Sequence, residues 1–152
     1  MRVLLDTGIL LRLVNRSSVE HLDVIASVQE LRRRGEELVT TPQNLVEFWN
    51  VSTRPAQARG GFGRSTAEAE RCLHFFEGLG KVLPEQPAIH AEWKRLVALL
   101  GVSGKAVHDA RIAAQMLVAG VSDLLTLNAD DFRRYAEIKT WTPRDFLDGR
   151  FP

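Results

Sequence analysis

Cysteine is almost absent from this sequence, which has one in 152 residues. A single cysteine cannot form an internal disulfide, so a disulfide scaffold is excluded and a reducing compartment is expected. No apolar run approaches the roughly 20 residues that cross a bilayer. The first apolar run, residues 3–5, is also shorter than the core of about 7–15 residues in a signal peptide. We therefore expect a cytoplasmic protein that does not enter a membrane.

The sequence also lacks an excess of charge of one sign. Lys and Arg number 20 and Asp and Glu number 19, which gives a formal net charge of +1. This balance does not indicate a strongly basic nucleic-acid binder. Sixteen of the 20 basic residues are arginine, however, and arginine is the better bidentate partner for phosphate. If several acids were committed to a metal site, the remaining surface would be distinctly basic.

The composition is that of an ordinary folded domain. Hydrophobic residues make up 45% of the chain and charged residues 26%, which argues against disorder. The length fits one domain of roughly 100–200 residues. No repeat, low-complexity tract or long linker divides the chain. We therefore predict a single domain over residues 1–152.

Short apolar segments alternate along the chain with longer segments of helical periodicity. The predicted strands are residues 2–5, 38–41, 81–83 and 123–126, with a fifth candidate at 138–141. The predicted helices are residues 9–14, 21–34, 42–53, 65–77, 88–100 and 105–119. Such alternation is typical of βαβ units. It predicts an α/β fold of three layers, in which helices flank a central, mostly parallel sheet of four or five strands.

Acidic or amide side chains recur just beyond the ends of the predicted strands. Asp6 follows the first strand directly, and Glu47 lies early in the helix after the second. Asp109 lies in the first turns of the helix over 105–119, and Asn128, Asp130 and Asp131 follow the fourth strand. In parallel α/β sheets, ligands bind beyond the carboxyl ends of the strands. We therefore expect these side chains to meet at one edge of the sheet.

Each acid also has a simpler interpretation. Asp6 would cap a helix, Glu47 would face solvent, and Asp109 would be a first-turn acid favoured by the helix dipole. Taken together, however, clustered carboxylates repel one another, and a divalent cation would relieve that repulsion. Oxygen ligands without clustered Cys or His suit Mg²⁺ or Mn²⁺ rather than zinc. Such a site can generate a hydroxide nucleophile and stabilise a phosphoryl transition state.

Four short motifs carry a resemblance to a known family. They are Asp6-Thr7-Gly8, Val46-Glu47-Phe48-Trp49, residues 104–111 and residues 124–132. In their order and spacing, these motifs resemble the PIN-domain ribonucleases, and most of all the VapC-type toxins of bacterial toxin–antitoxin pairs. The resemblance spans essentially the full chain. It implies a PIN-like fold, RNA hydrolysis with Mg²⁺ or Mn²⁺, a small antitoxin partner and a homodimer.

The resemblance further implies that Asp6, Glu47 and Asp109 hold the metal and that Asp131 supplies the fourth acid, with Asn128 near the site. Family members often carry Asn or Ser two residues after the first Asp, where this chain has Gly8. The role of that side chain would be taken by Thr7 or by water, or would be lost.

Two other functions therefore stay open. One is a PIN-like RNA-binding or regulatory module without catalysis. The other is a doubly wound phosphohydrolase with a nucleophilic Asp, although such enzymes usually carry a second Asp where this chain has Gly8.

Geometry separates the candidates for the fourth oxygen. Asp123 opens its predicted strand and lies four residues before Leu127, so at about 3.3 Å per residue it is roughly 13 Å from the carboxyl end. Asp130 and Asp131 point about 100° apart if the turn is helical, so only one should face the cleft. Asp131 precedes Phe132, whose burial would fix the turn. We therefore predict Asp131 rather than Asp123 or Asp130.

Overall fold

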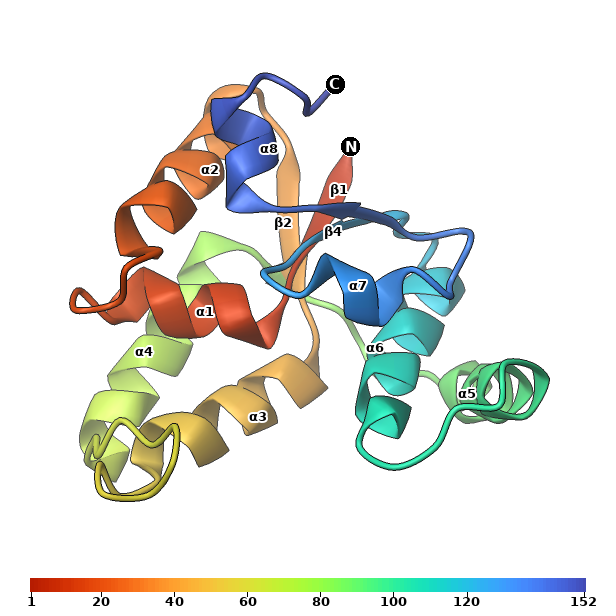
Figure 1. The fold of residues 1–152 in the computed structure, drawn as a ribbon, viewed down its shortest axis with the longest axis horizontal. Helices are drawn as coiled ribbons and strands as arrows, with labels where there is room; N and C mark the ends of the chain where they lie inside the picture. The colour runs from red at the N-terminus through yellow and green to blue at the C-terminus, as the bar shows by residue number, and fades with distance from the viewer.

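A computed structural model describes all of residues 1–152 and contains one five-stranded sheet (Figure 1). The strands are β1 (Arg2–Leu5), β2 (Glu37–Thr40), β3 (Lys81–Val82), β4 (Asp123–Leu125) and β5 (Lys139–Trp141). Their order in the sheet is β3-β2-β1-β4-β5, and every neighbouring pair is parallel. The predicted parallel sheet is confirmed, and β1 lies at its centre.

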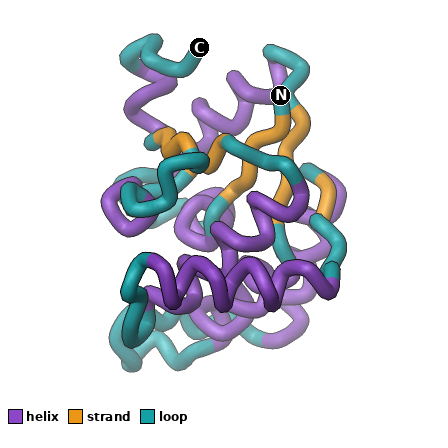
Figure 2. The backbone as a smooth tube through the Cα atoms, turned by 90° about the vertical axis from the view of Figure 1, so that its right-hand side faces the viewer, coloured by secondary structure: helices purple, strands orange, loops and turns teal.

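Eight helices surround the sheet. They are α1 (Thr7–Val14), α2 (His21–Arg33), α3 (Pro42–Thr53), α4 (Thr66–Leu79), α5 (Pro87–Leu99), α6 (Ala106–Ala119), α7 (Ala129–Phe132) and α8 (Pro143–Leu147). Figure 1 shows α1, α2, α3 and α4 on one side of the sheet and α5 and α6 on the other. Figure 2, turned by 90°, shows the strands enclosed by helices. No helix is long and apolar enough to cross a membrane.

The alternation of side chains along β1 divides the core into two clusters. Val3 and Leu5 pack with residues of α1 to α4, whereas Leu4, between them, packs with residues of α5 and α6. Successive side chains of a strand point to opposite faces, so a strand with apolar residues on both faces needs helices on both sides. The predicted three-layer arrangement is confirmed.

The register of the sheet places the ends of β1 and β4 side by side. Leu5 pairs with Leu125, and the Asp6 backbone N–H donates to the Leu125 carbonyl at 3.0 Å. Strand β4 therefore ends one residue earlier than predicted, and the next residue, Thr126, lies beside Asp6. This edge of the sheet is the one where the sequence predicts a ligand site.

Candidate active site

Asp6 is fixed at the centre of the carboxyl edge by two hydrogen bonds. Its Oδ1 accepts from the Thr7 backbone N–H at 2.7 Å, which caps α1, and its Oδ2 accepts from the Thr126 hydroxyl at 2.7 Å. The residue is only 9% exposed. Burial raises the pKa of Asp6, and the charges of Glu47 and Asp131 raise it further. The helix-cap interpretation is therefore correct, but the capping residue is also a buried acid with acidic neighbours.

Glu47 reaches the same edge from α3. Its Oε2 accepts from the Thr7 hydroxyl at 2.9 Å, and its Oε1 accepts from the Gln43 side-chain amide at 2.8 Å. The Thr7 hydroxyl in turn accepts from the Asn44 side-chain amide at 3.1 Å. Glu47 is half-buried, so the simpler interpretation, in which it projects into solvent, is wrong. Through Thr7, the first turn of α1 is joined to the start of α3.

Asp109 lies in the first turn of α6 and is half-buried. A helix N-terminus stabilises a negative charge and by itself favours the ionised form of an acid. The pKa of Asp109 is nevertheless raised to about 6, first by burial and then by the charges of Asp131, Asp6 and Glu47. Neighbouring His108 opposes this shift. Burial and the neighbouring acids therefore make the ionised form of Asp109 unfavourable.

The three acids near β4 have different surroundings in the structure. Asp131 is exposed on α7, and its charge raises the pKa of both Asp6 and Asp109. Asp130 instead forms an exposed ion pair with Arg133 at 2.8 Å. Asp123 is buried level with Val3 and accepts hydrogen bonds from Ser122 and the Trp141 indole. Phe132 is buried, as expected for a fixed turn.

The four predicted acids, Asp6, Glu47, Asp109 and Asp131, form what we call the acidic cluster. None of them forms a salt bridge with Lys or Arg. Their negative charge is therefore not neutralised by neighbouring basic side chains, in keeping with the raised pKa values of Asp6 and Asp109. Oxygen donors with unneutralised charge fit a hard divalent cation. As the side chains stand, no group of three or more is in metal-binding geometry.

Comparison with protein families gives a match over most of the chain. Residues 3–138 match the model of the PIN domain. The chain belongs to the PIN domain family. The resemblance stated from the motifs is confirmed, and the phosphohydrolase alternative is set aside. Comparison of the sequence with curated proteins gives no match.

Solved structures share the fold of this PIN domain at low sequence identity. VapBC-1 from nontypeable Haemophilus influenzae has a TM-score of 0.69 and 18% identity, over 95% of this chain and 99% of that chain. VapBC2 from Rickettsia felis, bound to a promoter DNA fragment, has a TM-score of 0.69 and 14% identity, over 93% and 98%. VapC20 from Mycobacterium tuberculosis, a sarcin-ricin loop cleaving toxin, has a TM-score of 0.56 and 17% identity, over 80% and 86%. These likenesses show the three-layer PIN fold.

Polar residues that were not predicted as site residues hold the acids in place. Thr126 donates to Asp6, and the Gln43 amide donates both to Glu47 and to the His108 carbonyl, the latter at 2.9 Å. Gln43 thereby ties α3 to α6. Its side-chain oxygen accepts from Arg111 at 3.2 Å. The spacing of Gln43 and Glu47, four residues apart on a helix, is the one sequence signal that could have found this contact.

Proposed function

We propose that this PIN domain is a metal-dependent endoribonuclease and the toxin of a toxin–antitoxin pair. The observation that supports this most is the acidic cluster, whose carboxyls come from four separated segments and lack basic partners. The similarity in fold to VapC20, a sarcin-ricin loop cleaving toxin, supports RNA as the substrate. An RNA-binding module without catalysis would not need to gather four acids against their mutual repulsion.

In this proposal Asp6, Glu47, Asp109 and Asp131 hold Mg²⁺ or Mn²⁺. The cation, when bound, supplies Lewis-acid catalysis at the scissile phosphodiester. The chain's own residues fix the orientation of its ligands. Thr126 and the start of α1 hold Asp6, and Thr7 with Gln43 holds Glu47. Such locked carboxylates reduce the reorganisation that binding would require.

The hydroxyl of Thr7 supports the proposal that an active site can form without a side chain at Gly8. It lies next to Asp6 in sequence and donates to Glu47 at 2.9 Å. A hydroxyl on this turn is therefore available to orient a candidate ligand without a side chain at Gly8. This contact supports an active enzyme over the non-catalytic alternative.

We also propose a small antitoxin protein as the partner of this chain. The solved structures that share its fold include VapBC-1, VapBC2 bound to a promoter DNA fragment, and FitAB bound to a DNA fragment. Expression of this chain alone should slow bacterial growth, and coexpression with the product of the adjacent upstream reading frame should restore it. Growth curves, together with mapping of new RNA 5′ ends after induction, measure both effects.

The control for that experiment is the Asp6→Asn variant at equal expression. It should leave growth and RNA ends unchanged. Normal growth with the folded, expressed wild-type protein would favour the non-catalytic module. Growth arrest by both wild type and Asp6→Asn would show that the toxicity does not come from the acidic cluster.

The acids near β4 allow a comparison within one short segment. Asp131→Asn should reduce metal-dependent RNA cleavage at least about tenfold more than Asp130→Asn or Asp123→Asn, since losing even a supporting contact of a metal site costs about 10–100-fold. Asp130 is the matched control because it is the adjacent exposed acid but pairs with Arg133. The three variants are assayed side by side with Mn²⁺. If Asp123→Asn is the most damaging, the assignment of Asp131 is wrong.

A further inference from the structure

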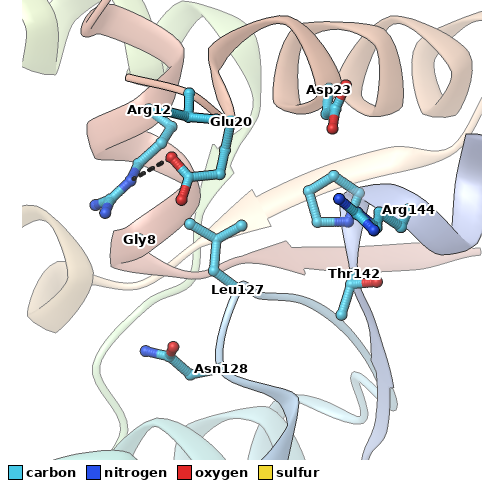
Figure 3. Close-up of a pocket in the computed structure, with 10 residues that line it drawn as sticks. Gly8, Arg12, Glu20, Asp23, Leu127, Asn128, Thr142 and Arg144 are labelled. Carbon is cyan, nitrogen blue, oxygen red and sulfur yellow. Dashed lines mark ion pairs between the residues drawn. The ribbon is translucent and has the colours of Figure 1, made fainter. Parts of the chain in front are cut away.

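Three arginines near the acidic cluster each pair with an acid outside it. The pairs are Arg12 with Glu20 at 3.8 Å, Arg111 with Glu85 at 2.9 Å and Arg133 with Asp130 at 2.8 Å. Figure 3 shows the first of these pairs, in a groove of about 440 Å³ that Gly8 also lines. The charge of each arginine is therefore offset by its own partner and does not neutralise the cluster.

Arg111 differs from the other two arginines because it also contacts a residue that holds a cluster acid. Its Nη2 donates to both carboxylate oxygens of Glu85, at 2.9 and 3.0 Å, and its Nη1 donates to the Gln43 side-chain oxygen at 3.2 Å. The Gln43 amide nitrogen donates to Glu47 Oε1 at 2.8 Å and to the His108 carbonyl at 2.9 Å. A continuous chain of polar contacts therefore runs from the turn before α5, through α6, to Glu47 on α3.

The direction of the Gln43 amide is set by its neighbours. The ionised Glu47 carboxylate and the His108 carbonyl can only accept hydrogen bonds, whereas the Arg111 guanidinium can only donate. If the amide turned over, its oxygen would face two acceptors and its nitrogen would face a donor. Only the observed direction satisfies all three contacts, and Arg111 is the side chain that donates to the amide oxygen.

Stability alone does not account for the contacts of Arg111. The side chains of Arg111 and Glu85 are 38% and 49% exposed. Exposed ion pairs contribute little to stability, because water and salt screen their charges. Glu85 does, however, offset the charge of Arg111. The guanidinium can therefore donate to Gln43 without placing an unbalanced positive charge beside a candidate cation site.

We propose that Arg111 is a positioning residue of the candidate metal site, which fixes the Gln43 amide so that Gln43 holds Glu47 ready to bind Mn²⁺ or Mg²⁺. The inference rests on the proposed metal-dependent function. Without Arg111 the amide is free to turn over, and Glu47 then loses a donor and faces a repelling oxygen. The loss of a residue that supports a metal ligand costs about 10–100-fold in metal affinity.

The test measures Mn²⁺ affinity rather than cleavage. Binding of Mn²⁺ to the full wild-type chain and to Arg111→Met is followed by electron paramagnetic resonance of the free ion. An arginine that acted only through its charge would repel the cation, so its removal would tighten Mn²⁺ binding. A positioning residue has the opposite effect, and Arg111→Met should weaken Mn²⁺ binding at least about tenfold.

Arg95→Met is the matched control. Arg95 is a half-exposed arginine of α5 that pairs with Glu92 through two hydrogen bonds, at 2.6 and 2.9 Å, and contacts no residue of the acidic cluster. The substitution removes the same charge and a similar ion pair. Arg95→Met should therefore bind Mn²⁺ as wild type does.

A second variant tests whether Arg111 acts through Gln43. Gln43→Met should weaken Mn²⁺ binding at least as much as Arg111→Met, and the double variant should bind no more weakly than Gln43→Met alone. Independent effects would instead multiply. Thermal melts in EDTA confirm that each variant is folded, as expected for side chains that are partly exposed.

The outcomes separate this inference from the proposed function. Wild-type or tighter Mn²⁺ binding by folded Arg111→Met would overturn the role of Arg111 and leave the ribonuclease proposal intact. Wild-type affinity in folded Gln43→Met, or losses that multiply in the double variant, would equally overturn the path through Gln43. A wild-type chain that binds no Mn²⁺ would overturn both the metal site and this inference.

Discussion

Replacement of Asp6 or Asp109 by asparagine is expected to reduce RNA cleavage at least about 100-fold, with the protein still folded. The loss of a residue that only supports a metal ligand already costs about 10–100-fold, and the loss of a ligand itself should cost no less. Purified variants are compared with wild type on the same RNA with Mn²⁺. Asp123→Asn is the control, since Asp123 is a buried acid of the same sheet outside the acidic cluster.

Neither substitution should unfold the chain. The side-chain oxygen of asparagine at position 6 can still accept from the Thr7 N–H, because Asn and Asp are equally good helix caps. Its amide can donate to the Thr126 hydroxyl, which accepts as well as donates. For Asp109 the raised pKa, about 6, means that the folded state disfavours the ionised form. As the pH rises from about 4 to about 6 the wild type therefore loses stability that Asp109→Asn keeps, and below pH 4 the two should melt alike.

Two outcomes would contradict the assignment. An Asp6→Asn protein with full activity, after contaminating ribonuclease has been excluded, would remove Asp6 from the site. An Asp6→Asn protein that is unfolded without metal would show that the carboxylate of Asp6 is needed for folding, so that its loss of activity would not identify a metal ligand. In either case Asp109→Asn, which caps no helix, tests the acidic cluster independently.

The sequence was most informative where a local pattern determines the structure. The apolar run of β1 and the helix predicted over residues 65–77 both correspond to observed elements, and in the structure a capping box between Ser65 and Glu68 begins α4. Helices α7 and α8 were not predicted, since four and five residues are too few to show helical periodicity. The predicted end of β4 was one residue too late, because Thr126 resembles a strand residue but turns toward Asp6.

In the candidate site, too, some features could be predicted from the sequence and others could not. Its acids could be predicted because the ends of parallel strands meet at one edge, a rule that needs only the order of the elements. Most of their supporting contacts could not, because they join residues far apart in sequence; the contact of Gln43 with Glu47, four residues apart, is the exception. Thr126 and Asp6 are 120 positions apart, and Thr7 and Glu47 are 40 apart. Thr126 lies within the motif over residues 124–132, but nothing in that motif identifies it as the partner of Asp6.

Millimolar Mn²⁺ is expected to raise the melting temperature of the wild-type protein by about 5–10 °C at pH 7.5. A ligand at about 100 times its Kd adds roughly 2.7 kcal/mol to the stability of the state it binds. For a domain of this size each kcal/mol corresponds to about 2–4 °C. Binding would draw the four carboxyls together and relieve the repulsion that raises the pKa values of Asp6 and Asp109. Thermal melts with Mn²⁺ and with EDTA measure the shift.

The pH dependence of this shift distinguishes a site at the acidic cluster from adventitious binding. Protons compete with a cation for carboxylate ligands. Because the pKa of Asp109 is about 6, it is mostly ionised at pH 7.5 and mostly protonated at pH 5, where the Mn²⁺ shift should become much smaller. The ion pair of Asp130 with Arg133 lies outside the cluster, so Asp130→Asn should keep the wild-type shift, and Asp6→Asn should lose it. Identical melts with Mn²⁺ and EDTA at pH 7.5 would count against the metal site, and a shift of equal size at pH 5 and 7.5 would place the bound ion elsewhere.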